Sequence, residues 1–392
     1  MEIIKKIFTL CLVLSPILSM YGIYNGSSIT ILDVLLVLLL SIIIIINIKK
    51  REIKIKNIYS EMLPYFYYII VNFCVISILS FTSIQTIDIG MRTLRYCIYL
   101  IVITFFVKEY FDYKFGIKVF KFLVIFATIY FFLQLILLRN FNFYLRGYVE
   151  FLPVLRENLV TFSETATYTP YTRVRSIFGE ISQFSICLCG YLCISMFKKN
   201  DFEERKTQIF LTLGLLLSVS SIGVLSIISL WIIWIIIKSI QMKDKINIKI
   251  LGLIISIIIL LIIFIGVSES FNKFIGRLGT SSYNRFGAYE DYYNYIKNKP
   301  LVNLLFGTGM DLSSFKVWYP SFAKILRFFG ITGIILFIYS ILRTYMTIKE
   351  ESPKIILLGY LIFLGFGTEV LVGNFLLLYY PFIIKKFEWD DY

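Results

Sequence analysis

The sequence contains no histidine at any of its 392 positions, which removes the commonest metal ligand and the commonest general base. Charge is scarce as well, since 16% of the residues are charged against about 25% in an average soluble domain. Hydrophobic residues make up 58% of the chain. A soluble protein of this composition would lack the polar side chains that cover a surface. The composition therefore predicts an all-α, polytopic integral membrane protein.

Cysteine gives no sign of a disulfide framework or a metal site. The six cysteines all fall inside apolar runs, which is typical of small packing residues. A Walker loop, a GxSxG elbow and an HExxH motif are missing too. We therefore expect no cofactor and no metal.

The net charge of +14 would suggest nucleic acid as a partner if the protein were soluble. In a membrane protein, positive charge gathers in cytoplasmic loops that face anionic lipid. We therefore expect membrane lipids and not nucleic acid as the partner of this charge.

Twelve apolar runs are long enough, or nearly so, to cross a bilayer, which takes about 20 residues. They predict about 12 transmembrane helices in a single domain, 1–392. The first run is expected to be a retained helix and not a cleaved signal peptide. A Ser-Val-Ser-Ser-Ile-Gly stretch at 218–223 leaves open whether 209–237 is one span or two. The runs are Ile7–Ile23, Ile31–Ile48, Met62–Phe81, Met91–Val107, Val119–Leu138, Ile177–Phe197, Ile209–Ser221, Gly223–Ile237, Ile248–Val267, Phe322–Tyr345, Ile355–Leu371 and Val372–Ile384.

Lysine and arginine divide between the two predicted faces of the membrane. With both termini in the cytoplasm, most lysines fall in cytoplasmic segments, such as 49–56 and 198–206. Most arginines fall at the other face. Lysine is enough to set topology, whereas the planar guanidinium matches phosphate and carboxylate. The arginines on the outer face therefore suggest anion binding. They could instead be headgroup anchors or partners of loop carboxylates.

Two long segments are predicted outside the cell, residues 139–176 and residues 268–320. The first ends in Arg-Val-Arg-Ser-Ile-Phe-Gly-Glu at 173–180 and runs straight into an apolar helix, whose N-terminus favours anions. The second carries a Tyr-Glu-Asp-Tyr-Tyr-Asn-Tyr-Ile stretch at 289–296, predicted to be an amphipathic helix that ends near Lys299-Pro300. A Gly-Thr-Gly turn follows at 307–309.

These patterns resemble the O-antigen polymerase and O-antigen ligase superfamily, the Wzy-type polysaccharide polymerases. The resemblance covers roughly residues 140–380. It depends on Arg173-x-Arg175 with Phe-Gly-Glu at 178–180, on the serine-glycine break, and on Arg277 and Arg285 before Asn-Lys-Pro-Leu-Val-Asn-Leu-Leu-Phe-Gly-Thr-Gly at 298–309. The break usually carries an arginine after serine, where this chain has Ser221 and Ile222. Ligases of the superfamily use an outer-loop histidine, so its absence favours a polymerase.

The resemblance implies a glycosyltransferase in the cytoplasmic membrane. Such an enzyme transfers a glycan from undecaprenyl pyrophosphate to an incoming lipid-linked repeat unit outside the cell. The product would be an O-antigen, a capsule or another exopolysaccharide. A flippase and a chain-length regulator are the expected protein partners. The leaving group is a lipid pyrophosphate, so fixed cations near it stabilise the transition state, and a carboxylate takes the proton of the acceptor hydroxyl.

The candidate residues follow from that chemistry. The phosphate ligands are expected among Arg173, Arg175, Arg277 and Arg285, and the general base is Glu180 or Glu290, with Asp311 behind them. Arg146 and Arg156 of the first outer segment are candidate substrate ligands, and Arg92 and Arg95 form a candidate second headgroup site. Asp33 and Glu369 stand inside apolar runs, which makes them functional candidates as well. Glu180, Glu290 and Asp311 could equally be paired with a neighbouring arginine. Asp33 and Glu369 each stand near a helix end, from which the side chain could reach water.

Three other functions compete with the polymerase. A flippase for lipid-linked oligosaccharides would also bind pyrophosphate, although its cations should lie in a membrane-deep cavity and not in loops. A ligase-type transferase would share the donor. A non-catalytic scaffold of a polysaccharide assembly complex would need none of the arginines.

Overall fold

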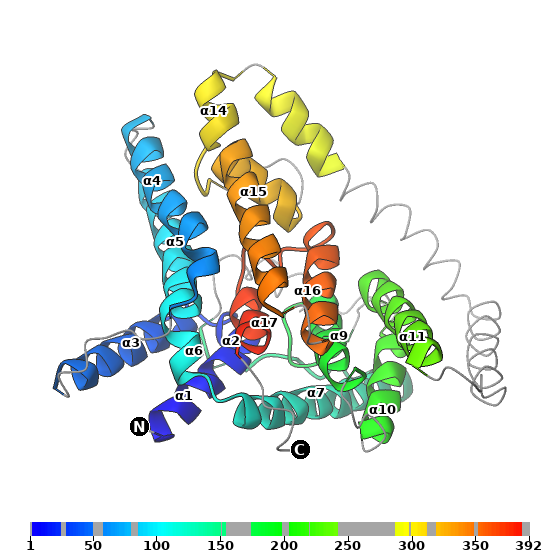
Figure 1. Ribbon diagram of the computed structural model, residues 1–392. Helices are drawn as coiled ribbons and strands as arrows, with labels where there is room; N and C mark the ends of the chain where they lie inside the picture. Colours follow the sequence, from blue (N-terminus) through cyan, green and yellow to red (C-terminus); the bar gives the residue numbers. More distant parts are fainter. Residues whose placement is uncertain are drawn as a thin grey trace.

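A computed structural model describes residues 2–24, 29–49, 58–79, 85–149, 151–153, 174–197, 204–218, 220–241, 287–297, 299–311, 319–348 and 352–385. Within these ranges the secondary structure is helical, apart from an isolated antiparallel bridge between Gly22 and Thr30. Figure 1 shows the helices gathered into one bundle, with α3 and α11 at its edges. The expectation of an all-α protein is confirmed for this part of the chain.

The helices follow the predicted apolar runs. Their bounds are α1 Glu2–Val13, α2 Ser15–Leu18, α3 Ile31–Lys49, η1 Ser60–Met62, α4 Leu63–Leu79, α5 Gln85–Ile101, η2 Val102–Phe106, α6 Val107–Tyr110, α7 Tyr113–Phe141, α9 Ile181–Ser195, α10 Arg205–Leu217, α11 Ser221–Gln241, α14 Leu301–Phe306, α15 Ser321–Ile348, α16 Ser352–Gly365 and α17 Phe375–Ile384. A further helix covers 287–296. The predicted run Ile248–Val267 lies outside the described residues.

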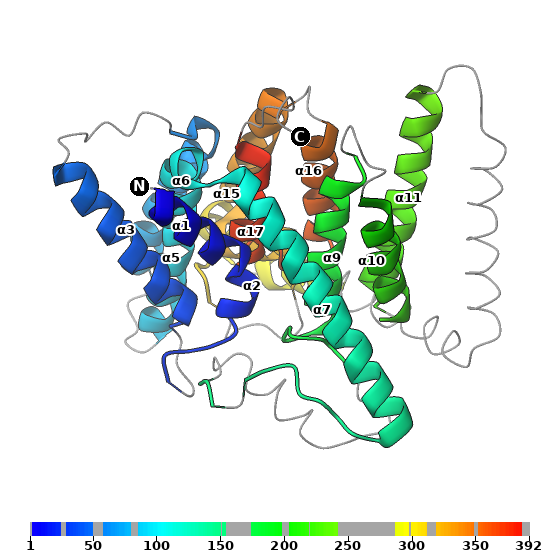
Figure 2. The same ribbon diagram turned by 90° about the horizontal axis from the view of Figure 1, so that it is seen from below.

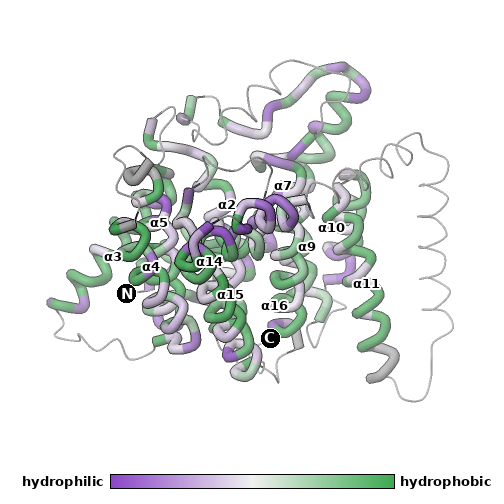
Figure 3. The backbone as a smooth tube through the Cα atoms, turned by 90° about the horizontal axis from the view of Figure 1, so that it is seen from above, coloured by the Kyte–Doolittle hydropathy of each residue, from purple (hydrophilic) through white to green (hydrophobic). Residues whose placement is uncertain are grey.

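Among the described residues, five helical segments are long and apolar enough to cross a membrane: Ile31–Lys49, Ser60–Ile78, Ile89–Tyr110, Tyr113–Phe141 and Ser321–Ile348. Four shorter apolar helices accompany them, including α9 and α17. Figure 3 shows apolar residues along most of the bundle helices. Many large apolar side chains are exposed, among them Leu38 and Ile45 of α3 and Phe122 of α7. A lipid environment accounts for such exposure, because lipid-facing side chains need no protein cover.

The serine-glycine stretch separates two helices. α10 ends at Leu217 and α11 begins at Ser221. The indole nitrogen of Trp231 donates to Thr212 Oγ1 at 3.3 Å, and the Arg205 guanidinium lies 4.6 Å from the Trp234 ring centroid. In each contact, one residue precedes the turn and the other follows it by a comparable number of residues. Residues 205–241 therefore form an antiparallel helix pair and not one long helix.

α15 is interrupted at Gly330, where φ is 67° and ψ is −169°. This region of backbone conformation is open essentially to glycine alone. The sequence predicts an uninterrupted helix over Phe322–Tyr345, so the break is a correction. The run contains two glycines, Gly330 and Gly333, and nothing in the sequence distinguishes the one at the break.

Carbonyl groups of α15 that lose their helical hydrogen bonds at the break accept hydrogen bonds from the Gly-Thr-Gly turn instead. The backbone nitrogen of Thr308 donates to the Arg327 carbonyl at 3.0 Å, and that of Gly309 donates to Phe328 at 3.0 Å. The Tyr68 hydroxyl of α4 donates to the Phe329 carbonyl at 2.6 Å. The expected turn is confirmed, because both of its glycines have positive φ. Broken helices persist in membranes where such partners satisfy the freed backbone.

α17 lies at the centre of the bundle, and every one of its residues is buried. Figures 1 and 2 show it surrounded by α1, α9, α15 and α16. The Tyr379 hydroxyl donates to the Ile186 carbonyl of α9 at 2.6 Å. The loop that enters α17, residues 366–374, therefore also occupies a central position.

Candidate functional site

A cavity of about 210 Å³ lies where this central loop meets α5, α9 and the first half of α15. It is smaller than the roughly 300–1,000 Å³ of drug-sized ligand pockets, so it suits a headgroup and not a whole lipid. Its lining draws on distant parts of the chain. The lining residues are Ser19, Met20, Thr30, Arg92, Arg95, Tyr96, Tyr99, Gln183, Met310, Lys324, Phe328, Glu369, Val372, Gly373 and Asn374.

α5 presents one polar face to the cavity. Arg92, Arg95, Tyr96 and Tyr99 are spaced three and four residues apart, which places them on the same side of the helix. Arg92 and Arg95 are predicted as a second headgroup site because they belong to the arginines of the predicted outer face. They share this cavity with Lys324, so three cations line it among the described residues. Glu369 is the carboxylate in the same lining.

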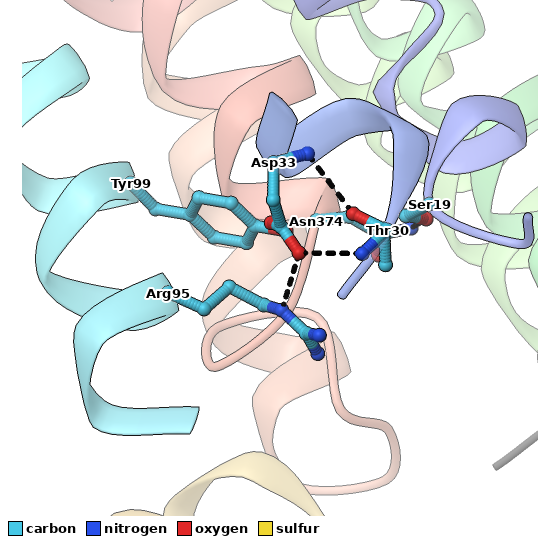
Figure 4. A network of polar contacts seen from close by, with 6 residues as sticks. All are labelled: Ser19, Thr30, Asp33, Arg95, Tyr99 and Asn374. Atoms are coloured by element: carbon cyan, nitrogen blue, oxygen red, sulfur yellow. Dashed lines mark hydrogen bonds and ion pairs between the residues drawn. The ribbon is translucent and has the colours of Figure 1, made fainter. Parts of the chain in front are cut away.

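Arg95 is fixed by Asp33 at the start of α3. Its Nε lies 2.9 Å from Asp33 Oδ2, and the Tyr99 hydroxyl donates to Asp33 Oδ1 at 3.2 Å (Figure 4). Asp33 also accepts from the Thr30 nitrogen at 2.8 Å, while its own nitrogen donates to Thr30 Oγ1 at 3.0 Å. This reciprocal pair is a capping box, with aspartate in place of glutamate. Asp33 thus caps a helix and orients an arginine at the same time.

Lys324 is paired with Glu369 across the cavity. Its Nζ lies 2.5 Å from Glu369 Oε2. The Lys324 side chain is 9% exposed and that of Glu369 is 44% exposed. The ammonium is therefore enclosed by protein, whereas the carboxylate reaches open space.

The loop around Glu369 is held by the start of α15. The Ser321 nitrogen donates to the Thr368 carbonyl at 2.7 Å, and Ser321 Oγ donates to the same oxygen at 2.7 Å. Ser321 Oγ in turn accepts from the Leu371 nitrogen at 3.0 Å. Ser321 precedes Lys324 by three residues, so one short helical segment positions both partners of the ion pair.

Two amides complete the polar lining. Gln183, in the first turn of α9, has a buried Oε1 for which the described residues supply no hydrogen-bond donor. The Asn374 amide donates to Ser19 Oγ (Figure 4). Ser15 Oγ donates to the backbone carbonyl oxygen of Asn374 at 3.1 Å. The Asn374 contacts tie the central loop to the turn after α2.

Chemically, the cavity combines cations that bind an anion with a carboxylate that accepts a proton. The cations lie in apolar helices, where charge interactions are stronger than in water. No group of three or more histidine, cysteine, aspartate or glutamate side chains gathers into a metal-binding cluster in the part of the chain described above.

Arg175 lies beside the cavity and not in its lining. It is 5% exposed, and its Nη1 donates to the Gly179 carbonyl at 2.5 Å. Its Nε donates to the Tyr144 hydroxyl at 3.5 Å. These contacts brace residues 175–179 just before α9. A Cβ at Gly179 would lie 3.3 Å from Gln183 Oε1 and 3.9 Å from the Met20 side chain, which shows how close this segment comes to the cavity.

The other predicted residues do not meet at one point. Glu180 and Arg146 are exposed, and Ser182 Oγ donates to Glu180 at 2.9 Å. Glu290 is exposed on the 287–296 helix. Asp311 follows Met310 of the cavity lining. Four further predicted residues lie outside the described residues, namely Arg156, Arg173, Arg277 and Arg285.

A second polar cluster surrounds Arg327, which is 1% exposed. Its Nη1 lies 3.3 Å from Asp291 Oδ2 and donates to the Tyr319 hydroxyl at 2.5 Å. The guanidinium also lies 4.1 Å from the Tyr295 ring centroid. Burial, and then the hydrogen bond to Asp291, raises the pKa of Tyr319, so it stays a phenol and donates to Asp291 at 2.6 Å. The expected helix over 289–296 is present and is fastened to α15 here.

The site residues that the sequence reasoning missed are Lys324, Asp291 and Arg327. Lys324 and Arg327 stand three residues apart in a long apolar run. A charged side chain inside a membrane helix is costly, so its presence in such a run is a sequence signal for a functional residue.

No protein-family model matches the chain, and no curated protein sequence matches it.

Proposed function

We propose that this protein is a polymerase of a surface polysaccharide. It transfers a glycan from undecaprenyl pyrophosphate to an incoming lipid-linked repeat unit on the outer side of the cytoplasmic membrane. The observation that carries the proposal is the cavity whose lining combines the cations Arg92, Arg95 and Lys324 with a half-exposed carboxylate, Glu369, which is paired with Lys324.

The charges fit the reaction. Breaking the bond between sugar and phosphate builds negative charge on the leaving pyrophosphate, and fixed cations stabilise that charge without reorganising. Arg95 is held in place by Asp33 before any ligand arrives. The acceptor hydroxyl must lose a proton as it attacks, and Glu369 is the carboxylate in the cavity lining that has exposed surface. Arg277 and Arg285 remain additional phosphate ligands in this proposal.

The proposed topology has about twelve spans, both termini in the cytoplasm and two outer segments, 139–176 and 268–320. Contacts between helix ends support an ordered bundle. Lys385 Nζ donates to the Lys108 carbonyl at 2.6 Å, so the end of α17 lies beside α6. The cavity lies away from this contact, because its lining residues on α5 precede η2 and α6, and its residues 372–374 come just before the start of α17.

The test is polymer synthesis in proteoliposomes. Purified protein receives lipid-linked repeat units extracted from the cells that produce it, and chain length is read on a gel. We expect long polymer with the wild type and its loss with Arg92→Ala and Lys324→Ala. The matched control is Arg343→Ala, which removes a cation from a separate hollow at the other end of α15. Wild-type protein that inserts correctly but makes no polymer would contradict the proposal.

A flippase for lipid-linked oligosaccharides is the second candidate, and α15 favours it. Discontinuous helices form the substrate sites of many transporters, and Lys324 and Arg327 lie in the half of α15 before the break at Gly330. The argument against a flippase requires that the cations lie only in loops. Lys324 and Arg327 do not meet this requirement, because they lie in a helix. Transport of labelled lipid-linked oligosaccharide across vesicles, without chain growth, would favour this candidate over the polymerase.

A further inference from the structure

We infer that Lys324 holds Glu369 inactive until a phosphate binds, and that the exchange of partners then frees Glu369 to act as the general base. This inference rests on the proposed function and adds a role for each member of the ion pair. Asp33 and Glu369 differ in the way that such an exchange requires.

The Asp33 carboxylate is held by several hydrogen bonds. It accepts hydrogen bonds from the Thr30 nitrogen, from Arg95 and from Tyr99, and it caps α3. Releasing it would leave several groups without their acceptor, so it is a fixed part of the scaffold.

Glu369 has a single ion pair in the described part of the chain, with Lys324. Its backbone is held through Ser321 on both sides, at Thr368 and Leu371, while its side chain is nearly half exposed. The carboxylate can therefore rotate away from Lys324 without disturbing the loop.

Lys324 cannot follow it. The Lys324 side chain is enclosed by protein and projects from a helical segment that is fastened at both ends, by Ser321 and by the 307–309 turn. A buried ammonium requires an anion, so an incoming phosphate can replace the carboxylate as its partner. Arg92 and Arg95 line the same cavity and bind that phosphate further.

The acceptor hydroxyl oxygen forms a bond to the anomeric carbon of the donor, and the bond from that carbon to the pyrophosphate oxygen breaks. The pyrophosphate leaves with the electron pair, and its charge is stabilised by Lys324, Arg92 and Arg95. The hydroxyl proton passes to the freed Glu369 carboxylate. Because Glu369 is released only when phosphate has bound, the base is available only when a donor is in place.

The experiment separates binding from transfer in Glu369→Gln. Affinity for undecaprenyl pyrophosphate is measured on protein in nanodiscs, and polymer synthesis is measured in proteoliposomes. Removing a competing carboxylate should leave affinity unchanged or raise it by up to about fivefold, which is about 1 kcal/mol. Transfer should fall by at least about 100-fold, the loss of a general base. Glu61→Gln, at the other end of the bundle, is the matched control and should change neither.

The exchanged pair, Lys324→Glu with Glu369→Lys, tests a purely structural role. The exchanged pair should restore thermal stability, because the ion pair is kept. It should restore neither binding nor transfer, because the cation then lies on the loop before α17 and not on α15. Restored transfer in this variant would overturn the inference, as would Glu369→Gln with normal transfer or with binding and transfer lost together. If the wild type neither binds the lipid nor makes polymer, the proposed function itself fails. An active wild type with an active Glu369→Gln overturns the inference alone.

Discussion

The backbone nitrogen of Gly309 donates a 3.0 Å hydrogen bond to the carbonyl oxygen of Phe328, two residues before the break in α15. Both residues adjoin the cavity, since Phe328 lines it and Gly309 precedes Met310, which also lines it. The contact joins the segment after α14 to the half of α15 that carries Lys324. Anything that alters this junction should therefore alter the cavity.

Gly330→Ala should destabilise the protein strongly. A Cβ at Gly330 would lie 2.3 Å from the Leu305 carbonyl oxygen, and the backbone conformation suits glycine alone. We expect a loss of about 2–3 kcal/mol, visible as a lower melting temperature in detergent. The control is Gly359→Ala in α16, where an added Cβ meets nothing within 4 Å. The explanation would be wrong if both variants melted alike.

Asp291→Asn and Glu290→Gln should behave differently although the two residues are neighbours. Asp291 contacts buried Arg327 and Tyr319, whereas Glu290 is exposed. Losing the charge that faces Arg327 should cost about 1.5–3 kcal/mol, and the Glu290 variant should be close to neutral. Thermal unfolding of both proteins measures the difference. Equal stability of the two variants would mean that the 287–296 helix is not fastened through Asp291.

Asp33→Ala should cost more than Thr30→Ala. The threonine variant loses one half of the capping box, typically about 1 kcal/mol. The aspartate variant loses the cap and also the partner of Arg95. It should therefore reduce both melting temperature and affinity for undecaprenyl pyrophosphate. The threonine variant keeps the Asp33–Arg95 contact and should reduce affinity less. A Thr30→Ala protein that loses affinity to the same extent would contradict this division of roles.

Arg277 and Arg285 are predicted phosphate ligands in the second outer segment. Alanine at either position should abolish long polymer while the protein still inserts. Lysine should rescue only part of the activity, because the bidentate fork of guanidinium is lost. Full activity of the alanine variants would remove these two residues from the site.

Much of the fold follows from the sequence because its main signal is long apolar runs separated by charge. Runs such as Ile31–Ile48 become helices with nearly the predicted bounds. The break in α15 could not be predicted, because Gly330 differs from other glycines only through its contact with residues 305–309, which are close in space. Single-residue breaks depend on tertiary hydrogen bonds that a sequence does not display.

The candidate site was only partly predictable, and for a related reason. Arg92 and Arg95 could be found because the sorting of arginine to the predicted outer face is visible in the sequence. Their convergence with Lys324 and Glu369 is a product of packing around α17. The capping role of Asp33 was within reach, since Thr30-Ile-Leu-Asp33 has the spacing of a capping box. The pairing of Arg327 with Asp291 and not with Glu290 depends on the rotation of the 287–296 helix.

The most direct measurement is the affinity of nanodisc-embedded protein for undecaprenyl pyrophosphate, compared among the wild type, Arg92→Ala, Lys324→Ala and Arg343→Ala. Loss of one charge-assisted phosphate contact should weaken binding by roughly tenfold or more in the first two variants. Arg343→Ala should bind like the wild type. Wild-type affinity in both cavity variants would contradict the assignment of this cavity to a lipid pyrophosphate.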